Sequence, residues 1–356
     1  MSLKKIAEMT GASVATVARI LNDPNHRTSE ELRRKVYQAA RELNYIPNDA
    51  ARRLKSGGTE KQEIFHIDIL LTRDSEQNND PFFHELLRIL EIESRNHACI
   101  ISGVWNHPEF SDEKYCVTED VRQQVKMLYE KNAHESDGLV IIGKCHAKVI
   151  QELKRYEKNI VSINRNSTNY AVDEVICDGG KTALLAISYL VKCGHSKIAY
   201  VGDCHNEARF AGYQAAQSQF HLESNLDYIY DTTASESNGY QAMEYFLRLP
   251  APPSAIYCAN DILAVGLLNG LAKRRNQYYT PSVISNDDIE EAQYTVPLLT
   301  TVSLPKREMV RFALMFLTDR IRGRHRIVAK LELEGTLVIR ESVRPFSEMH
   351  EPEYYI

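Results

Sequence analysis

From Ile64 onward, short apolar segments alternate with amphipathic helical segments, and this alternation constrains the fold more than any other feature of the chain. The predicted strands lie at 64–71, 99–104, 138–142, 160–163, 197–201, 228–230, 255–258 and 283–285. The predicted helices lie at 83–97, 119–132, 146–157, 179–193, 207–220, 236–248, 260–273 and 306–323. Strands that alternate with helices form parallel sheets covered by helices. Roughly 280 residues of this pattern favour two sheets over one.

The N-terminal segment has a different pattern, which predicts three short helices. The first covers 3–10, and the tight turn at Gly11 is followed by Ser13, a favoured N-cap for the second helix. A third helix starts at Thr28 or Ser29, where Thr28 and Glu31 have the spacing of a capping box. In the second helix the residues expected to pack inward are Val17, Ile20 and Leu21, and those expected to face outward are Val14, Ala15, Thr16 and Arg19. Helix, short turn and second helix form the layout of a helix-turn-helix.

The charge of the chain is unevenly distributed. The 356 residues carry a formal net charge of −5, with 43 Lys and Arg against 48 Asp and Glu. Residues 1–58 hold 11 basic and 6 acidic residues, a balance of +5, so the remaining 32 basic and 42 acidic residues have a balance of −10. A basic segment joined to an acidic body indicates a small anion-binding module attached to a separately functioning domain.

Several classes of function are not supported by any motif. No run of eighteen apolar residues or signal peptide is present, and the seven cysteines form no CxxC pair, which together predict a cytoplasmic protein. The twelve histidines have no metal-binding spacing, and no catalytic nucleophile motif occurs. Gly179-Gly180-Lys181-Thr182 lacks the earlier glycine of a phosphate-binding loop, so it is interpreted as a helix start with Asp178 near the N-cap. We therefore expect no enzyme activity, no cofactor and no metal.

The segments "KKIAEMTGASVATVARILN", "VYQAARELNYIPN" and "ARRL" occur in order within residues 3–54. This region resembles the headpiece of the lactose/galactose-repressor (LacI/GalR) family. The resemblance implies an all-α, helix-turn-helix DNA-binding domain over 1–58, including a hinge helix at about 48–55. It also implies a homodimer, because the wedge of one hinge helix pairs with its copy from a second subunit.

The resemblance assigns DNA-contacting roles to residues of this sequence. Val14 and Ala15 would make apolar contacts in the major groove and Arg19 would bind a guanine edge. Asn48 would cap the hinge helix, and Leu54 would enter the minor groove at a central step. The full set of implied DNA-binding residues is Ser13, Val14, Ala15, Thr16, Arg19, Asn22, Asn48, Arg53 and Leu54. The pair Val14-Ala15 with Arg19 is similar to galactose-type repressors and implies a pseudo-palindromic operator with a central CG step.

The resemblance continues to about residue 343, through "DGGKTALLAISYLVKCGHSKIAYVG", "YCANDILAVGLLNGL" and "LVIRESV". It implies a periplasmic-binding-protein-like (type I) sensor domain over 59–343, built from two parallel-sheet lobes. The expected N-terminal lobe covers about 62–162 and 292–324, and the C-terminal lobe covers about 163–290 and 325–343. The chain is expected to cross between the lobes near 162, 291 and 325.

Polar residues that follow predicted strands indicate a ligand site between these lobes, because ligands of open α/β sheets bind beyond the carboxyl ends of strands. Arginine, amide and carboxylate side chains can together bind vicinal hydroxyl groups, and an aromatic face can cover a sugar ring. The candidate effector-binding residues are Phe82, Phe83, Asn164, Arg209, Asn260 and Asp287, with Arg165 beside Asn164 as a weaker candidate. Arg209 is expected to pair with Asp203 or Asp287 if it does not bind ligand, and Asp261 is expected to be a helix N-cap.

The combination predicts a sequence-specific repressor of sugar-utilisation genes that a small sugar, such as a galactoside, releases from DNA. One alternative is a regulator of the same architecture with a purine or other non-sugar corepressor. A second is a sugar-binding transport component, which the headpiece and the lack of a signal peptide disfavour. The tail, 344–356, contains Pro345 and Pro352 and no leucine heptad, which predicts a dimer and not a coiled-coil tetramer.

Overall fold

The computed structural model describes residues 3–22, 28–43, 63–72, 81–131, 136–205, 207–274 and 279–346. The chain divides into two compact units, Met1–Glu63 (the headpiece) and Ile64–Ile356 (the body), which we describe separately. The predicted hinge helix at 48–55, the linker after it and the tail beyond Phe346 lie outside the described residues. Within the ranges given above, no helix has the length and apolarity needed to span a bilayer.

The headpiece contains three helices, α1 (Leu3–Thr10), α2 (Val14–Asn22) and α3 (Glu30–Glu42), as the sequence pattern predicts. They enclose a small apolar core of Ile6, Ala7, Val17, Ile20, Val36 and Ala39. Gly11 adopts a φ of 67° after α1, a conformation that glycine takes without steric strain, and it allows the tight turn into α2. The hydroxyl of Ser29 accepts a hydrogen bond from the Leu32 amide at 3.3 Å, so Ser29 is the residue that caps α3.

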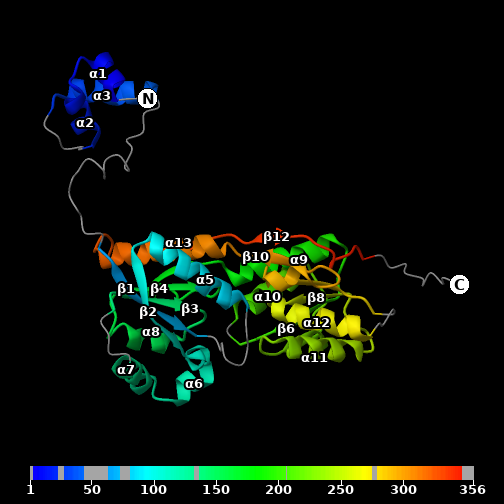
Figure 1. The fold of residues 1–356 in the computed structure, drawn as a ribbon. Helices are drawn as coiled ribbons and strands as arrows, with labels where there is room; N and C mark the ends of the chain where they lie inside the picture. The colour runs from blue at the N-terminus through cyan, green and yellow to red at the C-terminus, as the bar shows by residue number, and fades with distance from the viewer. Residues whose placement is uncertain are drawn as a thin grey trace. The chain divides into compact units, whose positions relative to one another are not determined.

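The body contains two six-stranded sheets, which lie side by side in Figure 1. We call the lobe that contains β1 the N-lobe and the other lobe the C-lobe. The sheet of the N-lobe has the order β11-β5-β4-β3-β1-β2, and all of its pairs are parallel. Its strands are β1 (Phe65–Leu71), β2 (Cys99–Asn106), β3 (Gly138–Ile142), β4 (Ile160–Asn164), β5 (Asp173–Ile176) and β11 (Lys330–Glu332). Its helices are α5 (Pro81–Asn96), α6 (Glu113–Thr118), α7 (Val121–Lys131), α8 (Ala147–Leu153) and α13 (Lys306–Ile321), with the short η1 (Pro108–Ser111).

The sheet of the C-lobe has the order β12-β10-β9-β8-β6-β7, and only its β10–β12 pair is antiparallel. Its strands are β6 (Ile198–Gly202), β7 (Ile229–Asp231), β8 (Ala255–Cys258), β9 (Ser282–Asp287), β10 (Thr300–Ser303) and β12 (Thr336–Val338). The accompanying helices are α9 (Gly179–Lys192), α10 (Ala208–Gln219), α11 (Glu236–Leu247) and α12 (Asp261–Arg274), with the short η2 (Leu226–Tyr228) and η3 (Glu290–Gln293). Val201 pairs with Cys258 and Tyr257 pairs with Ile284, so β6, β8 and β9 end at one edge.

The chain changes sheet later than the sequence pattern predicts. Strand β5 joins the N-lobe sheet and β10 joins the C-lobe sheet, so the changes fall after Ile176, after Ser303 and between Glu332 and Thr336. The expected positions near 162, 291 and 325 are therefore wrong by up to about one strand. The hydrophobicity pattern did not predict β5 because this strand begins with two buried acidic residues, Asp173 and Glu174. Asp173 accepts from both Nε and Nη2 of Arg320, at 2.5 and 2.6 Å, which satisfies its carboxylate inside the lobe.

The C-lobe helices α9 and α10 approach each other very closely at glycine. The Gly179-Gly180 sequence begins α9, and the Asp178 carboxylate caps it by accepting from the amides of Gly180 and Lys181 at 2.8 and 3.1 Å. A Cβ atom at Gly212 of α10 would lie 2.4 Å from the Gly180 carbonyl oxygen. These glycines are therefore required for contact between two helices, which explains the sequence that resembles a phosphate-binding loop.

Candidate DNA-reading surface and effector site

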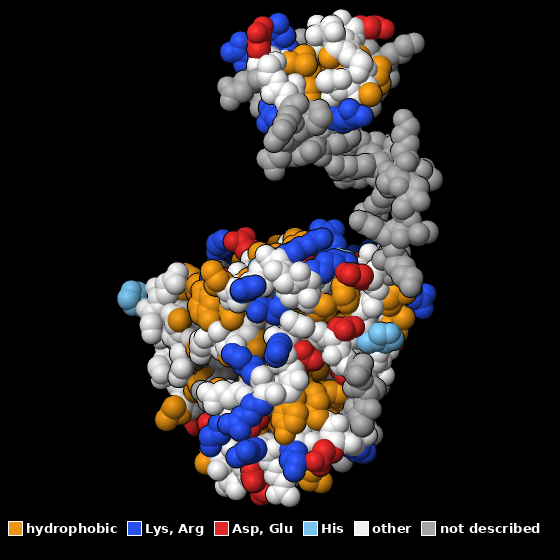
Figure 2. All heavy atoms as spheres, turned by 90° about the vertical axis from the view of Figure 1, so that its left-hand side faces the viewer, with side chains coloured by type: hydrophobic (Ala, Val, Ile, Leu, Met, Phe, Trp, Pro, Cys, Tyr) orange, Lys and Arg blue, Asp and Glu red, His pale blue; other side chains and the backbone are white. Residues whose placement is uncertain are grey.

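The outer face of α2 is the candidate DNA-reading surface of the headpiece. Val14, Ala15 and Arg19 are exposed while Val17 and Ile20 of the same helix are buried, as the pattern predicts. Lysine and arginine side chains lie at the headpiece surface in Figure 2. The helix therefore presents two small apolar side chains and one long cation on one face, a combination suited to thymine methyl groups and a guanine edge.

The start of α2 is fixed by a local cap. The Ser13 hydroxyl accepts a hydrogen bond from the Thr16 amide at 3.1 Å, and its oxygen lies 2.8 Å from the Thr16 hydroxyl. This arrangement satisfies one amide of the first turn and keeps both hydroxyls at the exposed end of the helix. The side chain of Asn22 and the whole of Asn48, Arg53 and Leu54 lie outside the described residues.

Arg209 lies in the first turn of α10, and the structure pairs it with a residue that sequence reasoning missed. Its Nε donates to Glu207 Oε1 at 2.8 Å, and its Nη1 donates to the Ala259 carbonyl at 2.7 Å. Arg209 and Glu207 are each about 3% exposed. Burial alone would lower the pKa of Arg209, but the Glu207 carboxylate, with Asp287 further away, raises it. Of the two expected partners, Asp287 acts on Arg209 through its charge, and the ion pair that the structure shows is with Glu207. Glu207 is also the N-cap of α10. An acidic residue two positions before Arg209, at the start of a predicted helix, is the feature of the sequence that could have predicted this ion pair.

Asp287 ends β9 and carries the contact between the two lobes. Its Oδ1 accepts from Nη1 of Arg165, which follows β4 of the N-lobe, at 2.6 Å. Both side chains are almost fully buried. Asp287 and Asp288 have φ values of 120° and 51°, which are uncommon for residues with a Cβ and cost free energy locally. The turn that results directs Asp287 to the N-lobe and allows Asp288 to accept from Arg340 at 2.7 Å.

Phe82 and Phe83, in the first turn of α5, lie against the same arginine. Their rings meet edge to face with centroids 5.2 Å apart. The Arg165 guanidinium carbon lies 4.3 Å from the centroid of Phe82, and Nζ of Lys306 lies 5.6 Å from it. Phe82, Arg165 and Asp287 are therefore brought together, and the face of Phe82 that was expected to cover a ligand ring stacks on a planar cation.

The residues predicted after β4 and β8 have local structural partners. Asn164 is half-buried, and its side-chain oxygen accepts from the Arg165 amide at 2.7 Å. Asn260 is 4% exposed and caps α12, because its side-chain oxygen accepts from the Leu263 amide at 3.3 Å. The prediction that Asp261 is the N-cap is wrong, because this residue lies inside the helix and is fully buried.

Asp261 accepts three hydrogen bonds beneath the strand ends. The donors are the hydroxyls of Ser285 and Thr301, at 2.5 and 2.6 Å, and the amide of Ile289, at 2.9 Å. Burial, with Asp287 nearby, raises the pKa of Asp261 to about 7 despite these donors. Ser285 and Thr301 belong to β9 and β10, so one carboxylate links α12 to the two strands beside the site.

Ion pairs lie around the strand ends, beside the buried carboxyl of Asp261. Four cations and four carboxylates form four ion pairs, namely Arg165–Asp287, Arg209–Glu207, Arg340–Asp288 and Lys306–Glu85. Lys306 also donates to the Asp288 carbonyl at 3.1 Å, which adds a second contact between the lobes. A bound anion or cation would leave one member of a buried pair without its counter-charge, which is strongly unfavourable. The arrangement therefore suits a neutral molecule with several hydroxyl or amide groups.

A helix-turn-helix headpiece followed by a two-lobed α/β body defines a class of ligand-sensing DNA-binding proteins. Residues 2–48 match the family "Bacterial regulatory proteins, lacI family", and residues 187–343 match the "Periplasmic binding protein-like domain" family. The chain therefore carries a lacI-family helix-turn-helix domain, followed by a periplasmic-binding-protein-like domain in its body.

Individual relatives extend along nearly the whole chain. The HTH-type transcriptional repressor CytR of Escherichia coli (strain K12) is 28% identical over 353 residues, which cover 96% of each chain. A transcriptional regulator CelR–cellobiose complex has a TM-score of 0.65 with 21% identity, over 96% of this chain and 99% of that one. The lac repressor dimer bound to operator and the anti-inducer ONPF has a TM-score of 0.64 with 21% identity, over 97% and 99%. These structures establish the shared fold.

Proposed function

We propose that this protein is a cytoplasmic repressor of sugar-utilisation genes and that a small neutral sugar, such as a galactoside, releases it from its operator. The observation that carries the proposal is the set of ion pairs at the strand ends, between Arg165 and Asp287 above all. Hydroxyl groups can accept from Arg165 and Arg209 and donate to Asp287 without changing the net charge of the site. The protein acts by binding and catalyses no reaction.

DNA binding and effector binding are assigned to separate parts of the chain. Residues 1–58 would bind DNA through Ser13, Val14, Ala15, Thr16, Arg19, Asn22, Asn48, Arg53 and Leu54, and residues 59–343 would bind the effector and the second subunit. A pseudo-palindromic operator with a central CG step would receive the two headpieces of a dimer. An effector can release the DNA only if it binds one arrangement of the lobes more tightly than the other. The Arg165–Asp287 and Lys306–Asp288 contacts are two of the links between the lobes, and such a ligand would replace them.

A homodimer is supported by an exposed apolar surface of the N-lobe. Strand β2 is the edge of its sheet, and its residues Ile100 and Val104 are 47% and 52% exposed. Ile92 of the neighbouring helix α5 is 43% exposed. Edge strands that carry exposed β-branched residues pair with other chains unless they are covered. We propose that a second copy of the chain covers this surface.

A non-sugar corepressor is the second candidate, and the stacking of Arg165 on Phe82 favours it. The ring of Phe82 already accommodates a planar group at 4.3 Å, so a planar heterocycle such as a purine could take the place of the guanidinium. The two candidates differ in sign, because a corepressor would strengthen operator binding and an inducing sugar would weaken it.

The variant Arg19→Ala tests the proposed DNA-binding surface of α2. Loss of one bidentate contact to guanine is expected to weaken operator binding by about 1–3 kcal/mol and to leave binding to unrelated duplex almost unchanged. The measurement is fluorescence anisotropy with operator and scrambled duplexes at one fixed salt concentration. Lys35→Ala is the matched control, because Lys35 is an exposed cation of α3 that pairs with Glu31 at 2.8 Å. Equal losses on both duplexes would show that Arg19 contacts only phosphates.

A further inference from the structure

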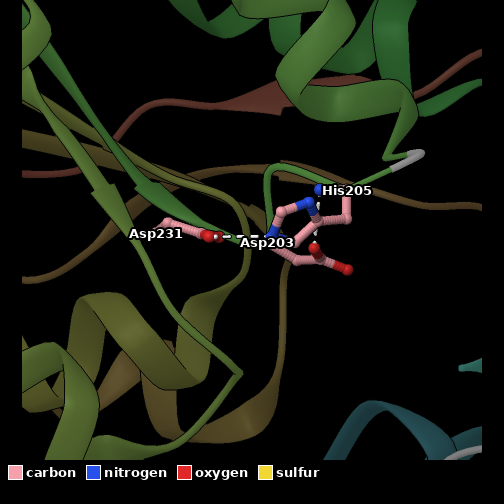
Figure 3. Close-up of side chains that lie close together, drawn as sticks. All are labelled: Asp203, His205 and Asp231. Carbon is pink, nitrogen blue, oxygen red and sulfur yellow. Dashed lines mark hydrogen bonds and ion pairs between the residues drawn. The ribbon is translucent and has the colours of Figure 1, made fainter. Parts of the chain in front are cut away.

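Two carboxylates and one imidazole come together away from the effector residues, where β6 and β7 end. Asp203 and His205 lie in the loop after β6, and Asp231 is the last residue of β7. Their ligand-type atoms all lie within 4.8 Å of one another, and they form the only such metal-binding group among the residues that the structure describes. Figure 3 shows the three side chains lying close together. No metal-binding spacing is visible in the sequence because Asp231 comes from a different strand than Asp203 and His205.

The distances are close to those of a coordination shell. His205 Nε2 lies 3.0 Å from Asp231 Oδ2. Ligand bonds of about 2.0 Å in a tetrahedral site place neighbouring ligand atoms about 3.3 Å apart. The His205–Asp231 pair therefore already has ligand spacing, and no separation in the group needs to contract by more than about 1.5 Å on that geometry. The side chains of His205 and Asp231 are 80% and 47% exposed, so both can move without disturbing a core.

The backbone holds the two carboxylates in place. Asp203 Oδ1 accepts from the His205 amide at 2.8 Å, and Asp231 Oδ1 accepts from the Cys204 amide at 3.0 Å. The loop after β6 is also tied to the N-lobe, because Nζ of Lys144 donates to the His205 carbonyl at 2.8 Å. One oxygen of each carboxylate thus shapes the loop, and the second oxygen of Asp231 faces Nε2 of His205.

We propose that Asp203, His205 and Asp231 bind one divalent transition-metal ion of the zinc class, with water completing its coordination. A neutral imidazole and two carboxylates carry a charge of −2 that such an ion balances. Imidazole nitrogen favours zinc, nickel and copper, whereas magnesium and calcium select shells made of oxygen alone. None of the three ligands belongs to the set of candidate effector-binding residues, and the ion would bind beside the contact between Lys144 of the N-lobe and the His205 carbonyl.

The test is calorimetric titration of the untagged, full-length protein with Zn²⁺ after treatment with a chelator, and Co²⁺ absorption as a spectroscopic probe. We expect one ion per chain and no comparable binding of Mg²⁺ or Ca²⁺. Because loss of an outer-shell partner already costs 10- to 100-fold in metal affinity, His205→Ala is expected to weaken binding by at least about tenfold. Asp231→Asn is expected to do the same.

His84→Ala is the matched control, since His84 is an exposed histidine on α5 outside the group. It should bind Zn²⁺ as the wild-type chain does. Zinc that is retained at full affinity by both His205→Ala and Asp231→Asn would overturn the proposal and would place the ion on other residues, such as the cysteines. Absence of stoichiometric Zn²⁺ binding by the wild-type chain, or equal binding of Ca²⁺, would overturn it as well. Far-ultraviolet circular dichroism of each variant establishes that the fold is retained.

Discussion

Replacing Arg209 with alanine is expected to lower the free energy of unfolding of the body by about 3–5 kcal/mol, the usual loss when one partner of a buried ion pair is removed. Glu207 would keep its charge at about 3% exposure without the 2.8 Å contact to Nε of Arg209. The Ala259 carbonyl would lose its donor at 2.7 Å. Unfolding in urea, followed by circular dichroism, measures the change.

The controls separate the ion pair from helix propensity. Gln214→Ala, at an exposed position of the same helix α10, is expected to change stability by less than about 0.5 kcal/mol. The double variant Glu207→Gln with Arg209→Met removes both charges and should be more stable than Arg209→Ala alone. In operator-binding assays Arg209→Ala should still bind duplex, because the headpiece has its own core, but it should no longer respond to the effector. An Arg209→Ala protein as stable as the wild type would contradict the role assigned to this pair.

A second large effect is expected in the pH dependence of stability, and it comes from Asp261. The pKa of this carboxyl rises from 3.8 to about 7 in the folded protein, first because of burial and then because of Asp287. Between pH 4 and pH 7 the folded protein binds more protons at Asp261 than the unfolded chain does. The contribution of Asp261 to the free energy of unfolding is therefore full below about pH 4 and is lost as the pH rises through 7. A shift of about three pKa units corresponds to at most about 4 kcal/mol over the window.

Asp261→Asn removes this titration while keeping the size of the side chain. The free energy of unfolding of the wild type, minus that of the variant, is expected to fall steadily from pH 4 to pH 8. Asp227→Asn, at an exposed acid of η2, should leave the wild-type profile unchanged. Parallel profiles of the wild type and Asp261→Asn would show that the three donors from Ser285, Thr301 and Ile289 keep the carboxylate charged at low pH.

Elements with a clear hydrophobic period were predictable from the sequence. Strands β3 and β8 have the predicted bounds, and the helix-turn-helix has the predicted buried and exposed faces. Strands β5 and β10 were not predicted because each begins with two buried polar residues. Asp173 and Thr301 are fully buried only because Arg320 and Asp261 satisfy them, and both partners are distant in sequence. Pairing over such separations leaves no local pattern.

For the candidate site, the sequence predicted where the residues lie but not which residues they contact. The topology rule that ligands bind at strand ends correctly located Arg209 and Asp287 at one edge of the C-lobe sheet. It could not give their partners, since Arg165 reaches Asp287 from the other lobe and Glu207 binds Arg209 through the geometry of a helix cap. The N-cap of α12 is Asn260 and not Asp261 for a related reason, because a helix boundary that shifts by one residue converts a cap into a buried acid.

The most direct test of the account is the affinity of the full-length protein for an operator duplex with and without a panel of neutral sugars and nucleosides. We predict tight binding to a pseudo-palindrome with a central CG step and a 5- to 150-fold loss of affinity, on the general scale of allosteric coupling, when one neutral sugar is added. Assignment as a sugar-released repressor would be contradicted if the protein bound this duplex no better than a scrambled one, or if the bound sugar left operator affinity unchanged.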